Sequence, residues 1–186
     1  ILNYNYSEKK VLELQEELKQ YDVKTIIIRA DVSSEEEVKD MVELGIKEFK
    51  HIDVLINNAG IAIDTVFEDK TVENFRRTLD VNLIGPFLTS KYVGKYMLEN
   101  NYGKIINIAS TNGIDTFYPE SLDYDASKAG LISLTHNLAV QYAPIINVNA
   151  VAPGWVNTDM NKELDKEFVN EENKKILLKR FASPEE

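Results

Sequence analysis

The sequence predicts an α/β fold: a doubly wound, Rossmann-like parallel sheet between two layers of helices. Short apolar, β-branched segments alternate with longer segments of helical period along the 186 residues. Repeated strand–helix–strand units of this kind form parallel sheets covered by helices on both faces. No internal repeat, low-complexity tract or flexible linker interrupts the alternation. We therefore expect residues 1–186 to form a single domain.

Four segments have the composition of buried parallel strands. They are KTIIIRA (24–30), IDVLINN (52–58), GKIINIAS (103–110) and INVNAVA (146–152). Four further segments predict helices. Residues 8–20 place Val11, Leu14 and Leu18 on one stripe, and residues 72–99 form one long helix or two consecutive ones. Residues 124–142 align Leu131, Leu134, Leu138 and Tyr142.

The remaining helix is predicted from its start. In residues 33–49, Ser33 and Glu36 have the spacing of a capping box. The same segment directs four apolar side chains toward the core, namely Val38, Met41, Val42 and Phe49.

The composition excludes several classes of function. The formal net charge is −10, so a nucleic acid would be repelled. There is no cysteine and there are two histidines, which argues against disulfides and against a metal site. No apolar window has the ~18 residues of a membrane span, and the first residues do not resemble a secretory signal. We expect a soluble cytoplasmic protein without metal, nucleic-acid or membrane partners.

Small and polar residues follow each predicted strand. They are Asp31 and Val32, then Asn58, Ala59 and Gly60, then Ser110, and finally Pro153 and Gly154. Such residues also belong to ordinary turns. In open α/β sheets, however, ligands bind beyond the carboxyl ends of the strands, and four such ends indicate a binding crevice.

A tyrosine and a lysine in YDASK, Tyr124 and Lys128, lie four residues apart at the start of a predicted helix. The spacing places both side chains on one helix face, but Tyr6 and Lys10 share it, so spacing alone does not decide their role. A nearby ammonium favours the phenolate form of tyrosine. Ser110, at the end of a neighbouring strand, could hold a substrate oxygen at the same point.

Five ordered motifs resemble the short-chain dehydrogenase/reductase family. They are NNAG at 57–60, Asn82 in LDVNLIG, Ser110 in IINIAS, Tyr124 and Lys128 in YDASK, and PGWVNT at 153–158. The likeness extends from residue 1 to residue 186 and looks nearest to the β-ketoacyl carrier-protein reductases of fatty acid biosynthesis. It implies a nicotinamide-dependent oxidoreductase that reduces a ketone or β-ketoacyl group, or oxidises the alcohol.

The resemblance implies roles for individual residues. Tyr124 would be the proton donor and acceptor, Ser110 would polarise the carbonyl, and Lys128 would also bind the nicotinamide ribose. Asn82 would continue a water-linked proton relay. The implied cofactor contacts are Asp31, Val32, Asn58, Ala59, Gly60, Tyr124, Lys128, Pro153, Gly154 and Val156, of which Asp31 and Val32 would contact the adenine and Val156 the carboxamide.

Two parts of the family pattern are missing. None of the eight glycines forms G-x-x-x-G-x-G, the turn that binds the pyrophosphate, and the last residues FASPEE come before the family's final helix and strand. We therefore expect one βα unit at the front and one αβ unit at the back to be absent. Our hypothesis is that the 186 residues alone do not turn over a cofactor.

The sequence favours NADP(H) over NAD(H), because LNYNYS has no acidic residue for the ribose hydroxyls before Glu8. The Arg expected for NADP is absent there too. An acyl carrier protein as partner is disfavoured by the acidic surface and by Asn101 and Pro144, where basic residues would be expected.

The charged segment around 157–181 predicts either a mobile substrate flap or a solvated helix pair. Phe117 and Tyr118 either line the approach to Tyr124 or pack their own loop. The resemblance implies a homotetramer built on the helices at 72–99 and 124–142, with Phe87, Tyr92, Tyr96, Ile132 and Leu138 suited to an interface or to a core.

The alternative to an enzyme is a catalytically inactive nucleotide-binding or interaction module. An epimerase or dehydratase that shares the Tyr-x-x-x-Lys spacing fits NNAG and PGWVNT less well.

Overall fold

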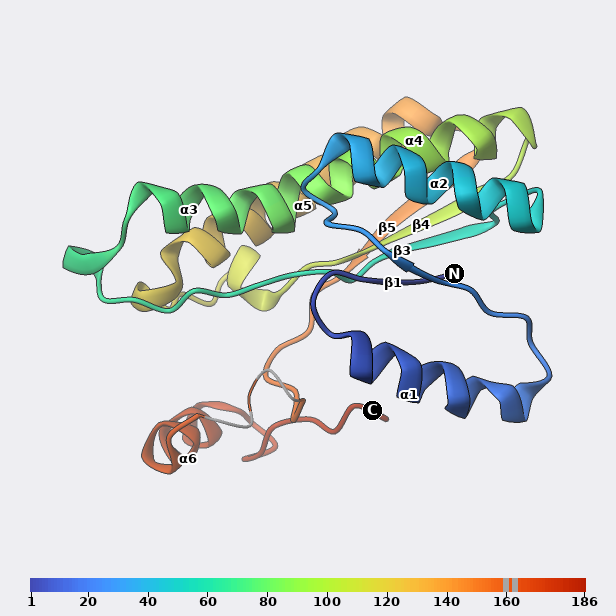
Figure 1. The fold of residues 1–186 in the computed structure, drawn as a ribbon. Helices are drawn as coiled ribbons and strands as arrows, with labels where there is room; N and C mark the ends of the chain where they lie inside the picture. Colours follow the sequence, from blue (N-terminus) through green and yellow to red (C-terminus); the bar gives the residue numbers. More distant parts are fainter. Residues whose placement is uncertain (159–160, 162–163) are drawn as a thin grey trace.

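The structure is a computed structural model, and it describes residues 1–158, 161 and 164–186. Strands and helices alternate along the chain (Figure 1). In chain order the main elements are β1 (Leu2–Tyr4), α1 (Glu8–Leu18), β2 (Ile27–Arg29), α2 (Glu35–Phe49), β3 (Val54–Asn57), α3 (Val72–Leu79), α4 (Gly85–Glu99), β4 (Gly103–Ile108), α5 (Leu122–Tyr142), β5 (Ile146–Val151) and α6 (Lys166–Lys175). A π-helical turn at Asp80–Ile84 joins α3 to α4.

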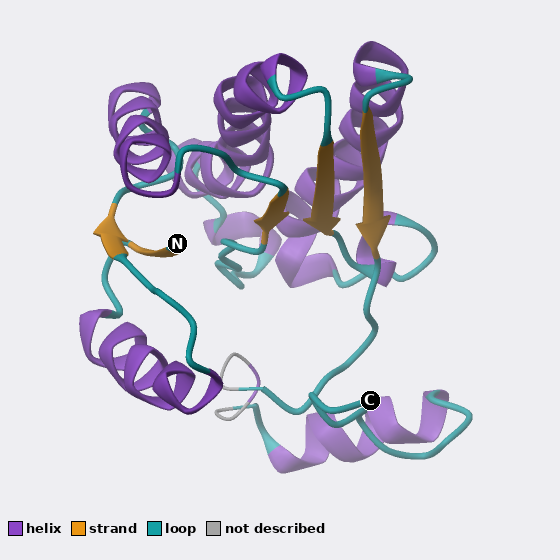
Figure 2. Cartoon of the chain, turned by 90° about the vertical axis from the view of Figure 1, so that its right-hand side faces the viewer, coloured by secondary structure: helices purple, strands orange, loops and turns teal. Residues whose placement is uncertain are grey.

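The strands form two parallel groups. β1 pairs with β2, with Leu2 opposite Ile27. β3, β4 and β5 are adjacent in that order, with Val54 opposite Lys104 and Gly103 opposite Ile146. Helices α2, α4 and α5 lie on one side of the strands and α1 on the other (Figures 1 and 2). The predicted parallel, layered fold is confirmed, and each of the four predicted strands is present in a shorter form.

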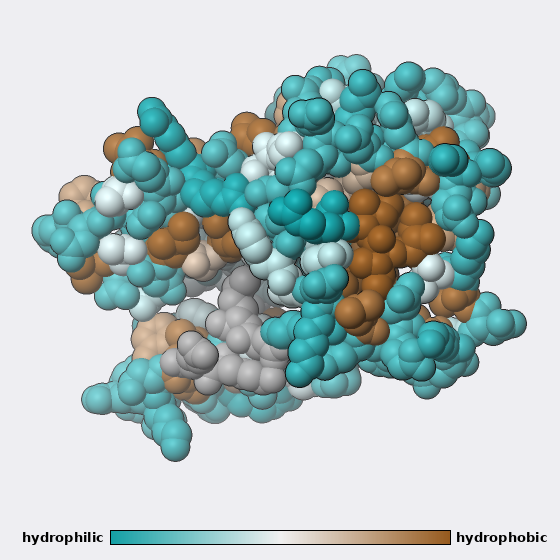
Figure 3. Space-filling model, viewed as in Figure 1, coloured by the Kyte–Doolittle hydropathy of each residue, from teal (hydrophilic) through white to brown (hydrophobic). Residues whose placement is uncertain are grey.

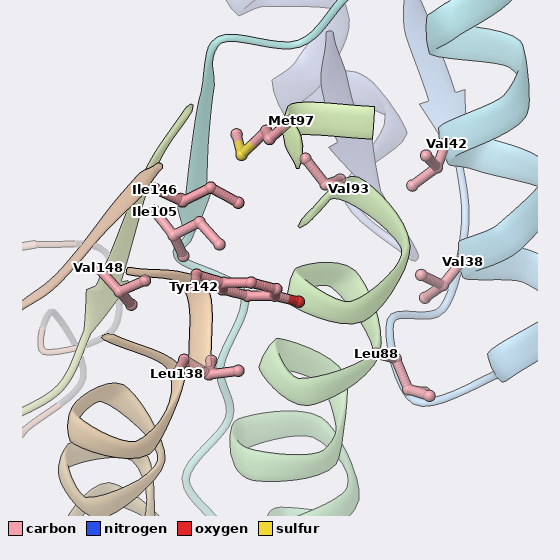
Figure 4. Close-up of a cluster of buried hydrophobic side chains, with 10 residues drawn as sticks. All are labelled: Val38, Val42, Leu88, Val93, Met97, Ile105, Leu138, Tyr142, Ile146 and Val148. Atoms are coloured by element: carbon pink, nitrogen blue, oxygen red, sulfur yellow. The ribbon is translucent and has the colours of Figure 1, made fainter. Parts of the chain in front are cut away.

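The main core lies between α2, α4 and α5 and the strands they cover (Figure 4). Met97 and Ile105 are completely buried, and Val38 and Val42 of α2 pack from the far side. Burying a side chain of this size stabilises a fold by about 1.5–3 kcal/mol. This packing fixes the distance between the helix layer and the strand ends, and therefore the frame of the site.

A buried polar chain joins the same elements. Asn57 Nδ2 donates to Asn107 Oδ1 over 2.8 Å, and Asn107 Nδ2 donates to Thr135 Oγ1 over 2.8 Å. On the other side, Thr89 Oγ1 donates to Asn57 Oδ1 over 2.6 Å. Because buried amides are costly unless they are paired, this chain selects one relative placement of β3, β4, α4 and α5.

A cavity of about 710 Å³ separates the two groups of strands. Ile1 and Asn3 line it on the side of β1, and Val54, Leu55 and Ile56 line it on the side of β3. Figure 3 shows apolar surface gathered between the upper helices and α1, where the N-terminus lies in Figure 1. Within the described residues, no strand pairs with the β3 edge that faces this cavity.

Two details differ from the sequence prediction. The N-cap of α2 is Ser34, whose side chain accepts from Glu37 N, rather than Ser33. Ser33 Oγ instead donates to Asp31 Oδ1 over 2.6 Å, because the carboxylate two residues earlier competes for the hydroxyl. On α1, Val11 is buried and Leu18 is half-buried, but Leu14 between them is 41% exposed, so the predicted stripe is only partly covered.

None of the helices in the described part of the chain is long and apolar enough to cross a membrane.

Candidate active site

Ser110 lies two residues after the end of β4 and directly before a short helical turn at Thr111–Gly113. Its backbone is extended, and its Oγ accepts a hydrogen bond from Asn112 N over 3.2 Å. The next residue is tied to β5, since Thr111 N donates to the carbonyl of Pro153 over 3.0 Å. Asn112 Nδ2 then donates to Asp125 Oδ1 of α5 over 2.7 Å. Ser110 is therefore held between the ends of β4 and β5 and the first turns of α5.

Tyr124 and Lys128 lie in the first two turns of α5, which begins at Leu122. Lys128 is almost completely buried, and its Nζ donates to the carbonyl of Ile108, at the end of β4, over 2.7 Å. The same Nζ lies 5.4 Å from the centre of the Tyr124 ring. Ser110 and Tyr124 line the same cavity as Lys128. The structure thus brings the predicted trio together.

Burial controls the ionisation of both groups. Desolvation lowers the pKa of Lys128 from 10.5 to about 8. Desolvation also raises the pKa of Tyr124, and the nearby hydroxyl of Ser110 works against this rise. The four-residue spacing predicts that the Lys128 ammonium favours the phenolate form of Tyr124. In this structure that ammonium donates to the Ile108 carbonyl, and burial has the larger effect on Tyr124.

Asn82 lies in the π-helical turn, and its side chain is completely buried. Its Oδ1 accepts from Ile61 N over 2.9 Å, and its Nδ2 donates to Ile61 O over 2.9 Å and to Ser127 Oγ over 3.0 Å. Ser127 Oγ donates in turn to the carbonyl of Tyr124 over 2.7 Å. Asn82 therefore braces the segment after β3 against α5, an arrangement typical of π-bulges at functional sites.

A cavity of about 790 Å³ opens beside these groups. The predicted site residues among those that line it are Asn58, Ala59, Gly60, Ser110, Tyr124, Lys128, Pro153, Gly154 and Val156. A side chain at Gly60 would approach Asn82 Oδ1 to 3.4 Å and Lys128 Nζ to 3.6 Å. The backbone at Gly60 therefore lies close to the Lys128 ammonium, and the absence of a side chain at Gly60 allows this approach.

Asp31 and Val32 lie apart from that cavity. Val32 lines the cavity between β1 and β3, and Asn58 and Ala59 line both cavities, so the two meet there. Asp31 accepts from Ser33 N over 2.9 Å and from Arg77 Nη2 over 2.9 Å. Burial opposes the ionisation of Asp31, but the hydrogen bonds from Ser33 and Arg77 outweigh it and lower its pKa.

Sequence reasoning missed an aromatic cluster over the cavity. Trp155, in PGWVNT, lines the cavity and stacks on Phe181, with ring centres 5.1 Å apart. Phe168 of α6 meets Trp155 edge-on at 5.7 Å and lies 5.5 Å from Tyr118. Trp155 Nε1 also donates to Glu172 Oε2 over 3.1 Å. Tyr118 lines the cavity, whereas Phe117 is 80% exposed.

The predicted flap around 157–181 contains α6, which Asp165 caps by accepting from Glu167 N over 2.8 Å. The aromatic contacts hold α6 beside the cavity. Part of this flap, residues 159–160 and 162–163, lies outside the described residues.

A second group missed by sequence reasoning is Arg29, the last residue of β2. Its Nη2 donates to Asn5 Oδ1 over 3.2 Å, and its Nη1 lies 3.7 Å from Glu37 Oε2. No arginine follows β1 directly, since Asn5 and Tyr6 occupy those positions. The β1–β2 register, which places Tyr4 opposite Arg29, supplies one from the neighbouring strand.

Comparison with known proteins agrees with this geometry. The chain matches the short chain dehydrogenase family over residues 1–168. It belongs to the short-chain dehydrogenase/reductase family. Members are NAD(P)-dependent oxidoreductases, so the resemblance seen in the five motifs is confirmed at the level of the family.

Curated relatives within this family have different names. The chain is 36% identical over 187 residues to a 3-oxoacyl-[acyl-carrier-protein] reductase of Synechocystis sp., covering 100% of this chain and 74% of the relative. It is 34% identical over 190 residues to glucose 1-dehydrogenase 2 of Bacillus subtilis, covering 100% of this chain and 73% of the relative.

Solved structures of similar proteins share the fold. A gluconate 5-dehydrogenase from Burkholderia cenocepacia, in complex with NADP and tartrate, superposes with a TM-score of 0.89 at 26% identity. A dehydrogenase/reductase from Sinorhizobium meliloti superposes with a TM-score of 0.90 at 28% identity. Each comparison covers 98% of this chain and 72% of the other.

Proposed function

We propose that the protein is an NADP(H)-dependent reductase of a ketone or β-ketoacyl group, or a dehydrogenase of the corresponding alcohol. One observation carries the proposal: Ser110, Tyr124 and Lys128 line the same cavity, with Lys128 Nζ 5.4 Å from the centre of the Tyr124 ring. An inactive nucleotide-binding or interaction module has no need for all three groups at one point.

The residues around the cavity fit a nicotinamide nucleotide. Lys128 uses one of its three N–H groups on Ile108, which leaves donors for ribose hydroxyls. A side chain at Gly154 would meet no atom within 4 Å, so the turn after β5 leaves open space at this position of the cavity wall. Asn58, Ala59 and Gly60 would form the path between the two halves of the nucleotide. The nicotinamide supplies or accepts a hydride at the substrate carbon when bound.

Protein groups would handle the oxygen of the substrate. Reduction builds negative charge on the carbonyl oxygen, which needs a fixed hydrogen bond and a proton. Ser110 would provide the hydrogen bond, and Tyr124 would donate the proton from its hydroxyl. The buried ammonium of Lys128 would stabilise the phenolate that remains. Asn82 would keep Ile61 and α5 at the separation this chemistry needs, and the proton would be replaced through the predicted water-linked relay.

Arg29 supports the preference for NADP(H). The guanidinium lies beside Asn5, just beyond the end of β1, and more than half of it is exposed and available for a ligand. An arginine suits a ribose phosphate because it presents several N–H donors in one plane. Within the segment Leu2–Ser7 that forms β1 and the following turn, no carboxylate competes for the ribose hydroxyls.

The substrate proposal stays at the level of a ketone or β-ketoacyl group. The two curated relatives named above divide between a carrier-protein substrate and a sugar. The aromatic rings of Trp155 and Tyr118 in the cavity wall favour a partly apolar substrate. A role in fatty acid biosynthesis would follow only if acyl thioesters are turned over.

We also propose that activity requires a further strand in the cavity between β1 and β3, followed by a glycine-rich turn. The apolar lining and the unpaired edge of β3 support this, since Val54 and Ile56 of β3 are 48% and 58% exposed and an exposed apolar strand edge is suited to pairing with another strand. The strand would complete a single domain of which residues 1–186 form part. Robust turnover by the 186 residues alone would refute this requirement.

We also propose that the protein assembles as a homotetramer in the cytoplasm. Ile84, at the end of the π-helical turn before α4, and Phe87 on α4 are 41% and 42% exposed, and Val140 on α5 is 81% exposed. Such surface is suited to burial between copies. Leu138, in contrast, is part of the core.

The test is a panel of ketones and β-ketoacyl thioesters, assayed with NADPH and NADH in the protein as its gene encodes it. We expect turnover of at least one carbonyl class, with NADPH preferred. Arg29→Met should weaken the binding of adenosine 2′,5′-bisphosphate about tenfold and leave that of 5′-AMP unchanged, a loss of about 1.4 kcal/mol. Equal losses for both nucleotides would contradict the role of Arg29. No turnover of any carbonyl would contradict the proposed activity.

A further inference from the structure

A lysine and an aspartate form an ion pair shielded from solvent near the catalytic helix. Lys70 Nζ lies 2.9 Å from Asp123 Oδ1, and the two side chains are 4% and 0% exposed. Removing two charges from water is unfavourable, and a well-packed apolar pair often stabilises a fold equally well or better. Stability alone therefore does not account for charged residues at these two positions.

The pair joins three segments around the start of α5. Asp123 lies in the first turn of α5, directly before Tyr124. Its second oxygen accepts a hydrogen bond from Thr78 of α3 over 2.7 Å. Lys70 also donates to the carbonyl of Ile63. Lys70 thus connects the segment that follows β3 to the helical turn that carries Tyr124.

The segment that follows β3 is also a wall of the cavity. Ile61, Ala62 and Asp64 line the cavity together with Tyr124, whereas Ile63 between them is held by Lys70. Asn82 makes a second connection of the same kind, since it binds Ile61 on one side and Ser127 of α5 on the other. Two braces therefore hold one short wall segment against the first turns of α5.

We propose that Lys70, acting through Asp123, is a positioning residue that sets the place of Tyr124 relative to this wall of the cavity. The inference rests on the proposed function, because it concerns where the phenol stands when it transfers a proton. Lys70 is not among the residues that line the cavity beside Ser110 and Tyr124. Its effect on Tyr124 is therefore exerted through Asp123 and Ile63. The Asn82 brace keeps the wall attached when Lys70 is replaced.

The test compares three variants in the protein as its gene encodes it. Lys70→Met leaves the Asp123 carboxylate buried without its partner. Lys70→Met/Asp123→Asn removes both charges and keeps an oxygen that accepts from Thr78, so this variant should retain the fold. Lys91→Met is the matched control, because it removes a lysine of α4 from an exposed ion pair with Glu35 of α2.

We expect the double variant to have the melting temperature of the wild type but a kcat lower by about 10- to 100-fold, because small misplacements of a catalytic group have effects of this size. Its KM and its Kd for NADPH should stay within about twofold of the wild-type values, and the control should match the wild type throughout. A double variant with wild-type kcat would overturn the proposal, since the pair would then serve stability only. A parallel loss of NADPH affinity would also overturn it.

Hydrogen exchange separates this inference from the proposed function. In the double variant, residues 61–66 and 122–128 should exchange faster together, while the core strands remain unchanged. Unaltered exchange in both segments would overturn the positioning role, whether or not turnover is detected. Absence of turnover in the wild type, with the expected exchange, would instead refute the proposed activity and leave the connection between the two segments in place.

Discussion

The buried ammonium of Lys128 should make stability depend on pH in a defined window. Its pKa falls from 10.5 to about 8 on folding because it is desolvated. Between pH 8 and 10.5 the folded chain has lost this proton while the unfolded chain still holds it. Since the unfolded state then binds more protons, the free energy of unfolding should rise with pH across this window. Below pH 8 both states carry the charge, and the contribution is constant.

The size of the effect follows from the gap between the two pKa values. At about 1.4 kcal/mol for each pH unit, the gap corresponds to about 3 kcal/mol. The measurement is urea unfolding of the wild type and of Lys128→Met from pH 6.5 to 10.5, with Lys91→Met controlling for the loss of one positive charge. We expect the difference in unfolding free energy between the wild type and Lys128→Met to change by about 3 kcal/mol in favour of the wild type as pH rises. A flat difference would show that Lys128 is not desolvated as described.

Two further predictions concern the frame of the site. Gly113→Ala should lower the stability by about 1–3 kcal/mol and reduce turnover, because the added Cβ would lie 2.6 Å from the carbonyl carbon of Lys128. Thermal unfolding with Gly154→Ala as the stability control, where nothing lies within 4 Å, would test this, and equal melting temperatures would contradict it. Ser34→Ala should cost about 1 kcal/mol in urea unfolding, because it removes the N-cap of α2. Ser133→Ala, at an exposed site in α5, should cost nothing, and equal losses would argue against the cap.

The strands and the catalytic trio could be predicted because each rests on a local signal. Continuous β-branched segments predict buried strands wherever they occur, and parallel strands bring their carboxyl ends to one edge. Ser110 and Tyr124 were therefore placed together from their positions after a strand and at a helix start. The predicted N-cap of α2, Ser33, is one residue away from the observed N-cap, Ser34. The sequence does not show that the Ser33 hydroxyl donates to the Asp31 carboxylate, because that depends on the orientation of Asp31 in the fold.

Other features depend on contacts between segments far apart in the chain. Arg29 reaches Asn5 only through the register of β1 and β2, and Lys70 meets Asp123 only after α3 packs against α5. The Asn57–Asn107–Thr135 chain likewise joins β3, β4 and α5. A single sequence shows these residues as ordinary polar positions, because nothing local distinguishes a buried partner from a solvated one.

The central claim is that Tyr124 transfers the proton in carbonyl reduction. The most direct test is Tyr124→Phe, which removes one hydroxyl and keeps the ring against Lys128. Turnover of the carbonyl substrate with NADPH and the Kd for NADPH should be measured on the same preparation. We predict that kcat falls by about 10²–10⁴-fold while the Kd for NADPH stays within about twofold of the wild-type value. Wild-type turnover in Tyr124→Phe would contradict the claim.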